Sequence, residues 1–164
     1  MTPKRSWIAV TGLALASAFV QPVCADGGDG GGGGSGGDPA TEPTLQPAYV
    51  KGIEAINQQR WADAVSALNG HVRGHWDHAD GHNYLAYAYR KSGRMDEAFR
   101  HYRRALQIDP RHLGAHEYIG EAYLQVNRPE EAERHLKRLS ELCLSQCNEY
   151  KDLQRAFTQY RASR

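Results

Sequence analysis

The sequence predicts an all-α protein, an α-solenoid built from stacked helix-turn-helix units. The first observation is a regular 34-residue interval, at which Ala64, Ala98 and Ala132 recur in step. The second is a pair of near-copies, Leu85-Ala86-x-x-Tyr89 and Ile119-Gly120-x-x-Tyr123, which stand at that same interval. The third is that apolar residues within each unit lie three to four positions apart, as on one helical face. Such an interval is typical of arrays whose units bury their apolar faces against one another.

The first 25 residues have the pattern of an export signal. Lys4 and Arg5 precede an apolar run, residues 8–20, and small residues end the segment at Ala25. The run is shorter than the roughly 20 residues that cross a bilayer. We therefore expect cleavage after Ala25 and a protein exported to the bacterial periplasm, without a stable membrane span. A lipid anchor on Cys24 and an uncleaved signal anchor remain alternatives.

Residues 26–47 are expected to form a disordered linker. Nine glycines lie between Asp26 and Asp38, and sequence of this composition behaves as a flexible coil. The formal net charge of the whole chain is +1. It becomes −1 when residues 1–25, with two cations and no acid, are removed. A near-neutral chain has no overall field for nucleic acid, so no nucleic-acid partner is expected.

The repeats are expected over residues 48–142, in units of about 45–78, 79–112 and 113–144. The first unit is the least regular, and its evidence is an apolar stripe at Tyr49, Ile53 and Ile56. In the second unit Gly93 suits a left-handed helix exit. Asp109-Pro110 then stops the following helix, because proline cannot continue it.

The third unit repeats the scheme and is followed by a cap. Its turn at Asn127-Arg128-Pro129 puts proline where a helix begins, the position that tolerates it best. Residues 143–164 are predicted to form a turn with a cysteine pair and then a capping helix. Tyr150, Leu153 and Phe157 give that helix one apolar edge.

These motifs resemble the tetratricopeptide repeat, whose pattern runs Trp-x2-Leu-Gly-x2-Tyr, then Ala-x3-Phe, then Pro. The second unit carries the likeness most fully, with His82 where tryptophan is usual. Its matching residues are Leu85, Ala86, Tyr89, Ala98, Tyr102, Ala105 and Pro110. The cysteine-bearing tail is similar to that of small exported bacterial repeat proteins, a likeness that implies no activity.

The resemblance implies a concave groove lined by the first helix of each unit, where a protein or peptide partner binds. The corresponding residues are Asp80, Asn83, Tyr87, Arg90, Lys91, Gly114, Glu117, Glu121, Leu124 and Gln125. One end of such a groove would be cationic and the other anionic, which would orient a peptide by its charges. These residues differ from the lysine and asparagine clamp that family members use for carboxylate tails. An ordinary solvated face is the alternative.

Cys143 and Cys147 invite a disulfide, because an exported chain lies in an oxidising compartment. A bridge is easier if the helix ends around Cys143 and the chain turns before Asn148. It would fix the angle of the cap. A thiol-redox partner and a metal site are the alternatives for this pair.

His71, His75, His78 and His82 follow one another at intervals of four, three and four. On an unbroken helix they would share one face and offer a site for zinc, copper or nickel. Gly74 and the neighbouring turn interrupt that helix, so packing and surface roles compete with a metal-handling function. A second pair, His112 and His116, poses the same choice.

The sequence therefore predicts an exported scaffold that binds a protein or peptide and performs no catalysis. Motifs of hydrolases, phosphate-binding loops and zinc proteases are missing, and no cofactor is expected. Metal handling by the histidines and thiol-redox exchange by the cysteines remain the rival functions.

Overall fold

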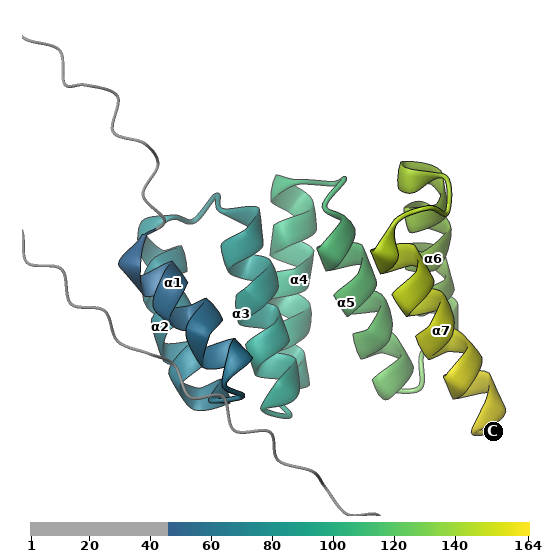
Figure 1. Ribbon diagram of the computed structural model, residues 1–164, viewed down its shortest axis with the longest axis horizontal. Helices are drawn as coiled ribbons and strands as arrows, with labels where there is room; N and C mark the ends of the chain where they lie inside the picture. The colour runs from purple at the N-terminus through teal and green to yellow at the C-terminus, as the bar shows by residue number, and fades with distance from the viewer. Residues whose placement is uncertain (1–45) are drawn as a thin grey trace, which may run out of the picture. The chain divides into compact units, whose positions relative to one another are not determined.

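The computed structural model describes residues 46–164, which form seven helices (Figure 1). Their bounds are α1 (Pro47–Asn57), α2 (Trp61–Gly74), α3 (Ala79–Lys91), α4 (Met95–Ile108), α5 (Leu113–Gln125), α6 (Pro129–Cys143) and α7 (Asn148–Ala162). None of these helices is long and apolar enough to pass through a membrane. The expected export signal, the lipid anchor on Cys24 and the linker up to residue 45 lie outside the described residues.

The helices pack as three antiparallel pairs and a final single helix, so the predicted all-α stack of helix hairpins is confirmed. α1 packs on α2, α3 on α4 and α5 on α6, and each pair contacts the next. α7 packs against both α5 and α6 (Figure 1). The first helix begins at Pro47, inside the segment expected to be linker.

The recurring small residues lie where helices approach closely. Ala64, Ala98 and Ala132 are fully buried, and so are Leu68 and Tyr102 one turn after the first two. A methyl side chain lets two helix backbones come near each other, and the bulky residue one turn later fills the remaining space. The buried core positions therefore recur every 34 residues, once in each hairpin.

The turn inside each hairpin also repeats. Gln59, Gly93 and Asn127 follow one another at the same interval, and each has a left-handed backbone, with φ of 57°, 77° and 59°. The following arginine in each turn pairs with an acid three residues later, at the start of the second helix: Arg60–Asp63, Arg94–Glu97 and Arg128–Glu131. Exposed ion pairs of this kind contribute little stability. The left-handed turn, rather than the ion pair, therefore determines how each hairpin reverses direction.

The predicted turn between α6 and α7 is present. α6 ends at Cys143, α7 begins at Asn148, and Cys143 and Cys147 form a disulfide with Cα atoms 5.7 Å apart. Two residues inside the loop, Leu144 and Ser145, have left-handed backbones, with φ of 50° and 61°. The bridge therefore closes a tight reversal that leads directly into the cap.

Replacing Leu144 with asparagine should stabilise the protein. The Leu144 side chain is 79% exposed, so little packing is lost. A left-handed backbone costs a leucine about 1 kcal/mol or more, and asparagine tolerates it better. We expect the free energy of unfolding in urea to rise by roughly 0.5 to 1 kcal/mol. Val50→Asn, at an exposed apolar residue inside α1, is the control and should give no gain. A loss of stability in Leu144→Asn would contradict this account.

Candidate functional site

The cap places α7 beside α5 and α6, where the first helix of a fourth repeat would lie. Leu153 of α7 is fully buried against Gly120 of α5. A Cβ at Gly120 would lie only 2.6 Å from the Leu153 Cδ2 atom, so any larger residue would push α7 away. Gly120 thus allows α7 to lie close to α5 and to supply one wall of a groove.

That groove has a volume of about 480 Å³ and lies between α3, α5 and α7. Its lining residues are Arg90, Lys91, Glu121, Leu124, Gln125, Ala156, Gln159, Tyr160 and Ser163. Five of them were predicted from the sequence and come from α3 and α5. Three residues of α7 and Ser163, which follows it directly, were missed, because that helix was interpreted only as a cap. In the 34-residue pattern α7 takes the place of the first helix of a fourth unit. That place could have indicated that α7 lines the groove.

Arg90 and Glu121, which were predicted to belong to opposite ends of the groove, form an ion pair across it. The Arg90 side chain is only 3% exposed and donates a hydrogen bond from Nη2 to Oε2 of Glu121 at 2.8 Å. Its guanidinium also lies 5.2 Å from the ring centroid of Tyr87 and 5.9 Å from that of Tyr118. α3 and α5 are neighbours, so this pair links two adjacent hairpins.

Asp80 and Tyr87, two further predicted groove residues from α3, do not line this cavity. Asp80 lies 3.0 Å from Nε2 of His112. The ring of Tyr87 packs against Trp61, with centroids 6.1 Å apart, and beneath the ammonium of Lys91. These residues join adjacent hairpins.

Asn83 on α3 and Glu117 on α5 are buried, and neither lines this groove. Asn83 is 2% exposed and its Oδ1 has no hydrogen-bond partner among the described residues. Glu117 is 9% exposed. Burial is the largest cause that raises the pKa of the Glu117 carboxyl to about 8, and the negative charges of Glu121, Asp152 and Glu149 raise it further. Glu149 and Asp152 were not predicted.

The predicted histidine cluster divides into two parts. Nε2 of His71 lies 2.7 Å from Nδ1 of His78, and the His75 ring stacks on His71. His82 turns away and pairs with His101 instead. The helix break between Gly74 and Ala79 causes this division. Within residues 46–164, no three or more His, Cys, Asp or Glu side chains are arranged to hold a metal ion.

Two histidine pairs repeat at the interval of the fold. Nδ1 of His82 lies 2.9 Å from Nδ1 of His101, and His116 and His135 stand at the same distance. Nε2 of His82 bonds to the Trp76 carbonyl and that of His116 to the Pro110 carbonyl, each at 3.1 Å. The first histidine must donate from Nε2 to that carbonyl, so its Nδ1 accepts from the second ring. The Nδ1···Nδ1 hydrogen bond of each pair therefore requires that at least one of its two rings is neutral.

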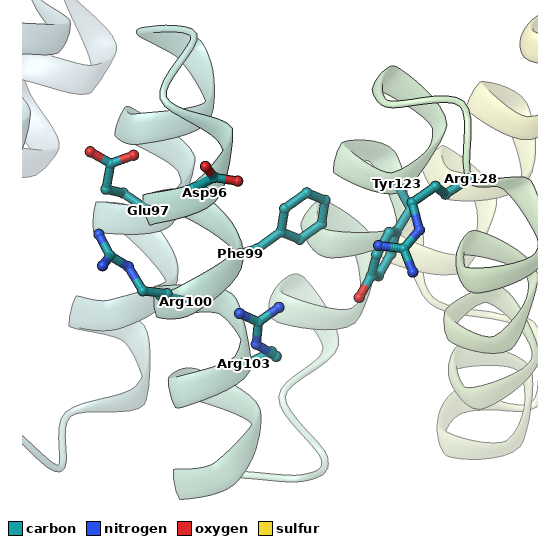
Figure 2. Close-up of a pocket in the computed structure, with 7 residues that line it drawn as sticks. All are labelled: Asp96, Glu97, Phe99, Arg100, Arg103, Tyr123 and Arg128. Atoms are coloured by element: carbon teal, nitrogen blue, oxygen red, sulfur yellow. The ribbon is translucent and has the colours of Figure 1, made fainter.

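A second groove, of about 600 Å³, was not predicted. Its lining residues are Asp96, Glu97, Phe99, Arg100, Arg103, Tyr123 and Arg128. Figure 2 shows Phe99 extending from its helix toward Tyr123, and the two ring centroids are 4.7 Å apart. Charges of both signs lie around these rings, so this groove favours no single class of ligand.

Comparison with solved structures supports the fold. The TPR2B domain of yeast Sti1, in complex with pHsp70, is 20% identical and covers 71% of this chain and 95% of its own, with a TM-score of 0.64. The first TPR of Spaghetti (RPAP3), bound to the HSP90 peptide SRMEEVD, is 19% identical and covers 70% and 90%, with a TM-score of 0.63. An arginine-to-glutamate mutant of MamA is 30% identical and covers 58% and 69%, with a TM-score of 0.55. No curated protein matches the chain.

Sequence models of one family account for most of the described residues. One model of the tetratricopeptide repeat matches residues 49–112 and another matches residues 89–156. Domains of this kind are typically non-catalytic scaffolds for protein interaction. The two matches agree with the buried positions and left-handed turns that recur every 34 residues. The chain belongs to the tetratricopeptide repeat family.

Proposed function

We propose that this protein is an exported, non-catalytic scaffold that holds a peptide segment of a partner protein in the groove between α3, α5 and α7. The groove itself carries the proposal. It combines apolar surface from Leu124, Ala156 and Tyr160 with the ionic groups of Lys91 and Glu121. Apolar anchors beside a few fixed polar groups are what peptide-binding grooves use.

The solved relatives support this proposal. The Sti1 domain is in complex with pHsp70 and the RPAP3 domain is bound to an HSP90 peptide. Their identity to this chain is low, so what they share with it is the fold. The identity of the bound segment therefore depends on the residues of this groove. Export is proposed from the pattern of residues 1–25 alone.

Site-specific photo-crosslinking tests the groove. A photoreactive amino acid at Gln125 or Gln159, both exposed in the groove, should capture a partner in the cells that produce the protein. Gln107 is the matched control, because it is an exposed glutamine on α4 outside the groove. We expect a discrete crosslinked product from the two groove positions and none from position 107. Capture at position 107 alone would contradict the proposal.

A further inference from the structure

The connections between successive hairpins carry exposed apolar residues at one repeat position. Trp76, Pro110 and Leu144 stand 34 residues apart, and each is the first residue of the turn between two hairpins. Trp76 and Leu144 are 65% and 79% exposed, and Pro110 is exposed as well. Single exposed apolar residues are ordinary on a protein surface. Here the exposure recurs with the fold and includes two of the three exposed large hydrophobic residues among residues 46–164.

Two of these residues depart from the repeat pattern. Pro110 is the proline that closes the tetratricopeptide repeat pattern, whereas tryptophan and leucine replace it in the other two connections. Leucine is a poor choice at position 144, because its backbone there is left-handed, with φ of 50°. Leu144 thus costs stability through its backbone and, being exposed, gains little from packing. An unfavourable residue that the fold does not need points to a role outside the fold.

The backbone of the first two connections is fixed by the same contact. The Trp76 carbonyl accepts hydrogen bonds from Nε2 of His82 at 3.1 Å and from Nη2 of Arg104 at 3.3 Å. The Pro110 carbonyl accepts one from Nε2 of His116, also at 3.1 Å. Both histidines stand six residues after the carbonyl that they bind. The contact holds each turn through its main chain and leaves the apolar side chain exposed.

A disulfide replaces this contact in the third connection. The residue six positions after Leu144 is Tyr150, whose hydroxyl accepts a hydrogen bond from Gln154. The bridge between Cys143 and Cys147 encloses Leu144 and fixes the turn covalently. All three connections are therefore held in place, by two different means, and each presents an apolar residue to solvent.

The three connections lie along one edge of the stack. The helices of each hairpin run antiparallel, so the turns within hairpins lie at one edge and the connections between hairpins at the other (Figure 1). The grooves of about 480 and 600 Å³ are lined by other residues. This edge thus presents separate projecting side chains, which suit insertion into a soft surface better than enclosure of a peptide.

Cationic groups lie beside the projecting side chains. The Arg104 guanidinium lies 5.3 Å from the centroid of the Trp76 ring. Three arginines along this edge make no ion pair with any of residues 46–164: Arg73, Arg104 and Arg111. Asp77 and Asp109 lie in the same connections, so positive charge is only slightly in excess. Tryptophan beside arginine is suited to a membrane interface, where indole lies among headgroups and guanidinium meets phosphate.

We propose that this edge docks on the surface of a phospholipid bilayer, with Trp76 and Leu144 inserted among the headgroups and the arginines against their phosphates. The edge is separate from the peptide groove, so the inference goes beyond the proposed function. Lipid removes the projecting apolar side chains from water, and this drives the insertion. The formal net charge of the chain is only +1, so insertion outweighs long-range attraction of charge.

Flotation with lipid vesicles tests the contribution of each side chain. The vesicles contain equal parts of phosphatidylcholine and phosphatidylglycerol, and the protein is the chain as purified from the cells that produce it. Trp76→Ala should weaken binding at least tenfold. Leu144→Asn should weaken it severalfold although that change is expected to stabilise the fold, so unfolding cannot explain the loss. About 0.5 M salt, which screens exposed charges, should leave most of the binding.

A transplanted tryptophan is the matched control. Gln58 is exposed in the turn within the first hairpin, at the opposite edge. Adding Gln58→Trp to Trp76→Ala restores the number of exposed tryptophans but should not restore binding. Recovery of affinity in this double variant would show that any exposed indole suffices, and it would overturn the assignment of this edge.

Tryptophan fluorescence decides whether this edge enters the lipid. Phenylalanine at positions 7 and 61 leaves Trp76 as the only tryptophan. Its emission should shift to the blue with vesicles and be quenched by lipids brominated on their acyl chains. Unquenched emission, loss of all binding in salt, or no binding by the native protein would overturn the inference. A photo-crosslink from position 76 to a protein, without quenching, would overturn it in favour of a protein partner; positions 125 and 159 test the groove separately.

Discussion

Replacing His101 and His135 with asparagine should make the folded protein more resistant to acid. Burial is the largest cause that lowers the pKa of each imidazole from 6.5 to about 4. The unfolded chain therefore binds more protons than the folded chain between these two values. The stability that these groups contribute is complete above pH 6.5 and is lost as the pH falls toward 4.

Neighbouring arginines add to the effect of burial in both pairs. Arg100 lowers the pKa of His101 and Arg134 that of His135, while Glu97 opposes the first of these effects. The partner rings, His82 and His116, are also lowered, again mainly by burial, and Arg104 and Arg138 add to it. At roughly 1.4 kcal/mol for each pKa unit, and allowing for partial exposure, each pair loses about 2 to 3 kcal/mol in acid. Two such losses are a large part of the stability of a small domain.

Asparagine isolates this effect because its amide nitrogen can take the place of Nδ1 and donate to the partner ring, yet it does not titrate. The free energy of unfolding in urea should fall less between pH 7 and pH 4 in His101→Asn/His135→Asn than in the native protein. His75→Gln, outside both pairs, is the control and should follow the native curve. Parallel curves for the native and double-variant proteins would rule out the pairs as the acid-sensitive element.

Glu117 also titrates with folding, so the pH dependence of the stability of the variant must be compared with that of the native protein. Its raised pKa of about 8 means that the folded state holds a proton that the unfolded state releases above about 4.5. The contribution of Glu117 to stability is therefore lost as the pH rises through this window, the opposite of the histidine pairs. Because the native protein and the variant share Glu117, the difference between their curves reports the histidines alone.

The core was predictable because its residues obey the repeat. Ala64, Ala98 and Ala132 mark one position in each hairpin, and all three are fully buried as the pattern requires. Gly93 was placed at a left-handed turn for the same reason, and its φ is 77°. Local rules of this kind act within one unit, so a single sequence contains them.

The site was less predictable because its contacts cross between units. His101 and His135 stand one repeat apart, as His82 and His116 do, and that double recurrence was the available signal. The two pairs were not predicted, because their members are far apart in the sequence and come from the two helices of one hairpin. The Arg90–Glu121 ion pair links neighbouring hairpins, and no sequence motif around either residue predicts it. Reversing the charge of Arg90 would therefore disturb the fold as well as the groove.

The packing of α7 on α5 depends on one glycine, Gly120. Residues 52, 86 and 120 share a repeat position, and all are small. At Gly52 a Cβ would lie 2.5 Å from Leu68, and at Gly120 it would lie 2.6 Å from Leu153. The position thus accepts a leucine from the neighbouring helix. For α7 this contact sets the position of the groove wall.

Adding Gly120→Ala should have opposite effects in two backgrounds. In the native protein the new methyl group collides with Leu153, and overpacking costs about 1 to 3 kcal/mol, partly offset by the helix preference of alanine. Leu153→Ala alone should cost about 2 to 5 kcal/mol, because it leaves a cavity under the cap. In that background the methyl group enters the vacated space, so Gly120→Ala should be neutral or stabilising.

Urea unfolding of the two single variants and the double variant measures this coupling between residues 120 and 153. Gly70→Ala is the matched control, because a Cβ there meets no atom within 4 Å. It should raise stability by roughly 0.5 to 1 kcal/mol in both backgrounds, as expected for alanine in place of glycine inside a helix. If Gly120→Ala destabilises both backgrounds equally, Leu153 does not pack on Gly120, and this contact does not hold α7 as the wall of the groove. If its effect changes sign, the contact between residues 120 and 153 positions α7 as the wall of the groove.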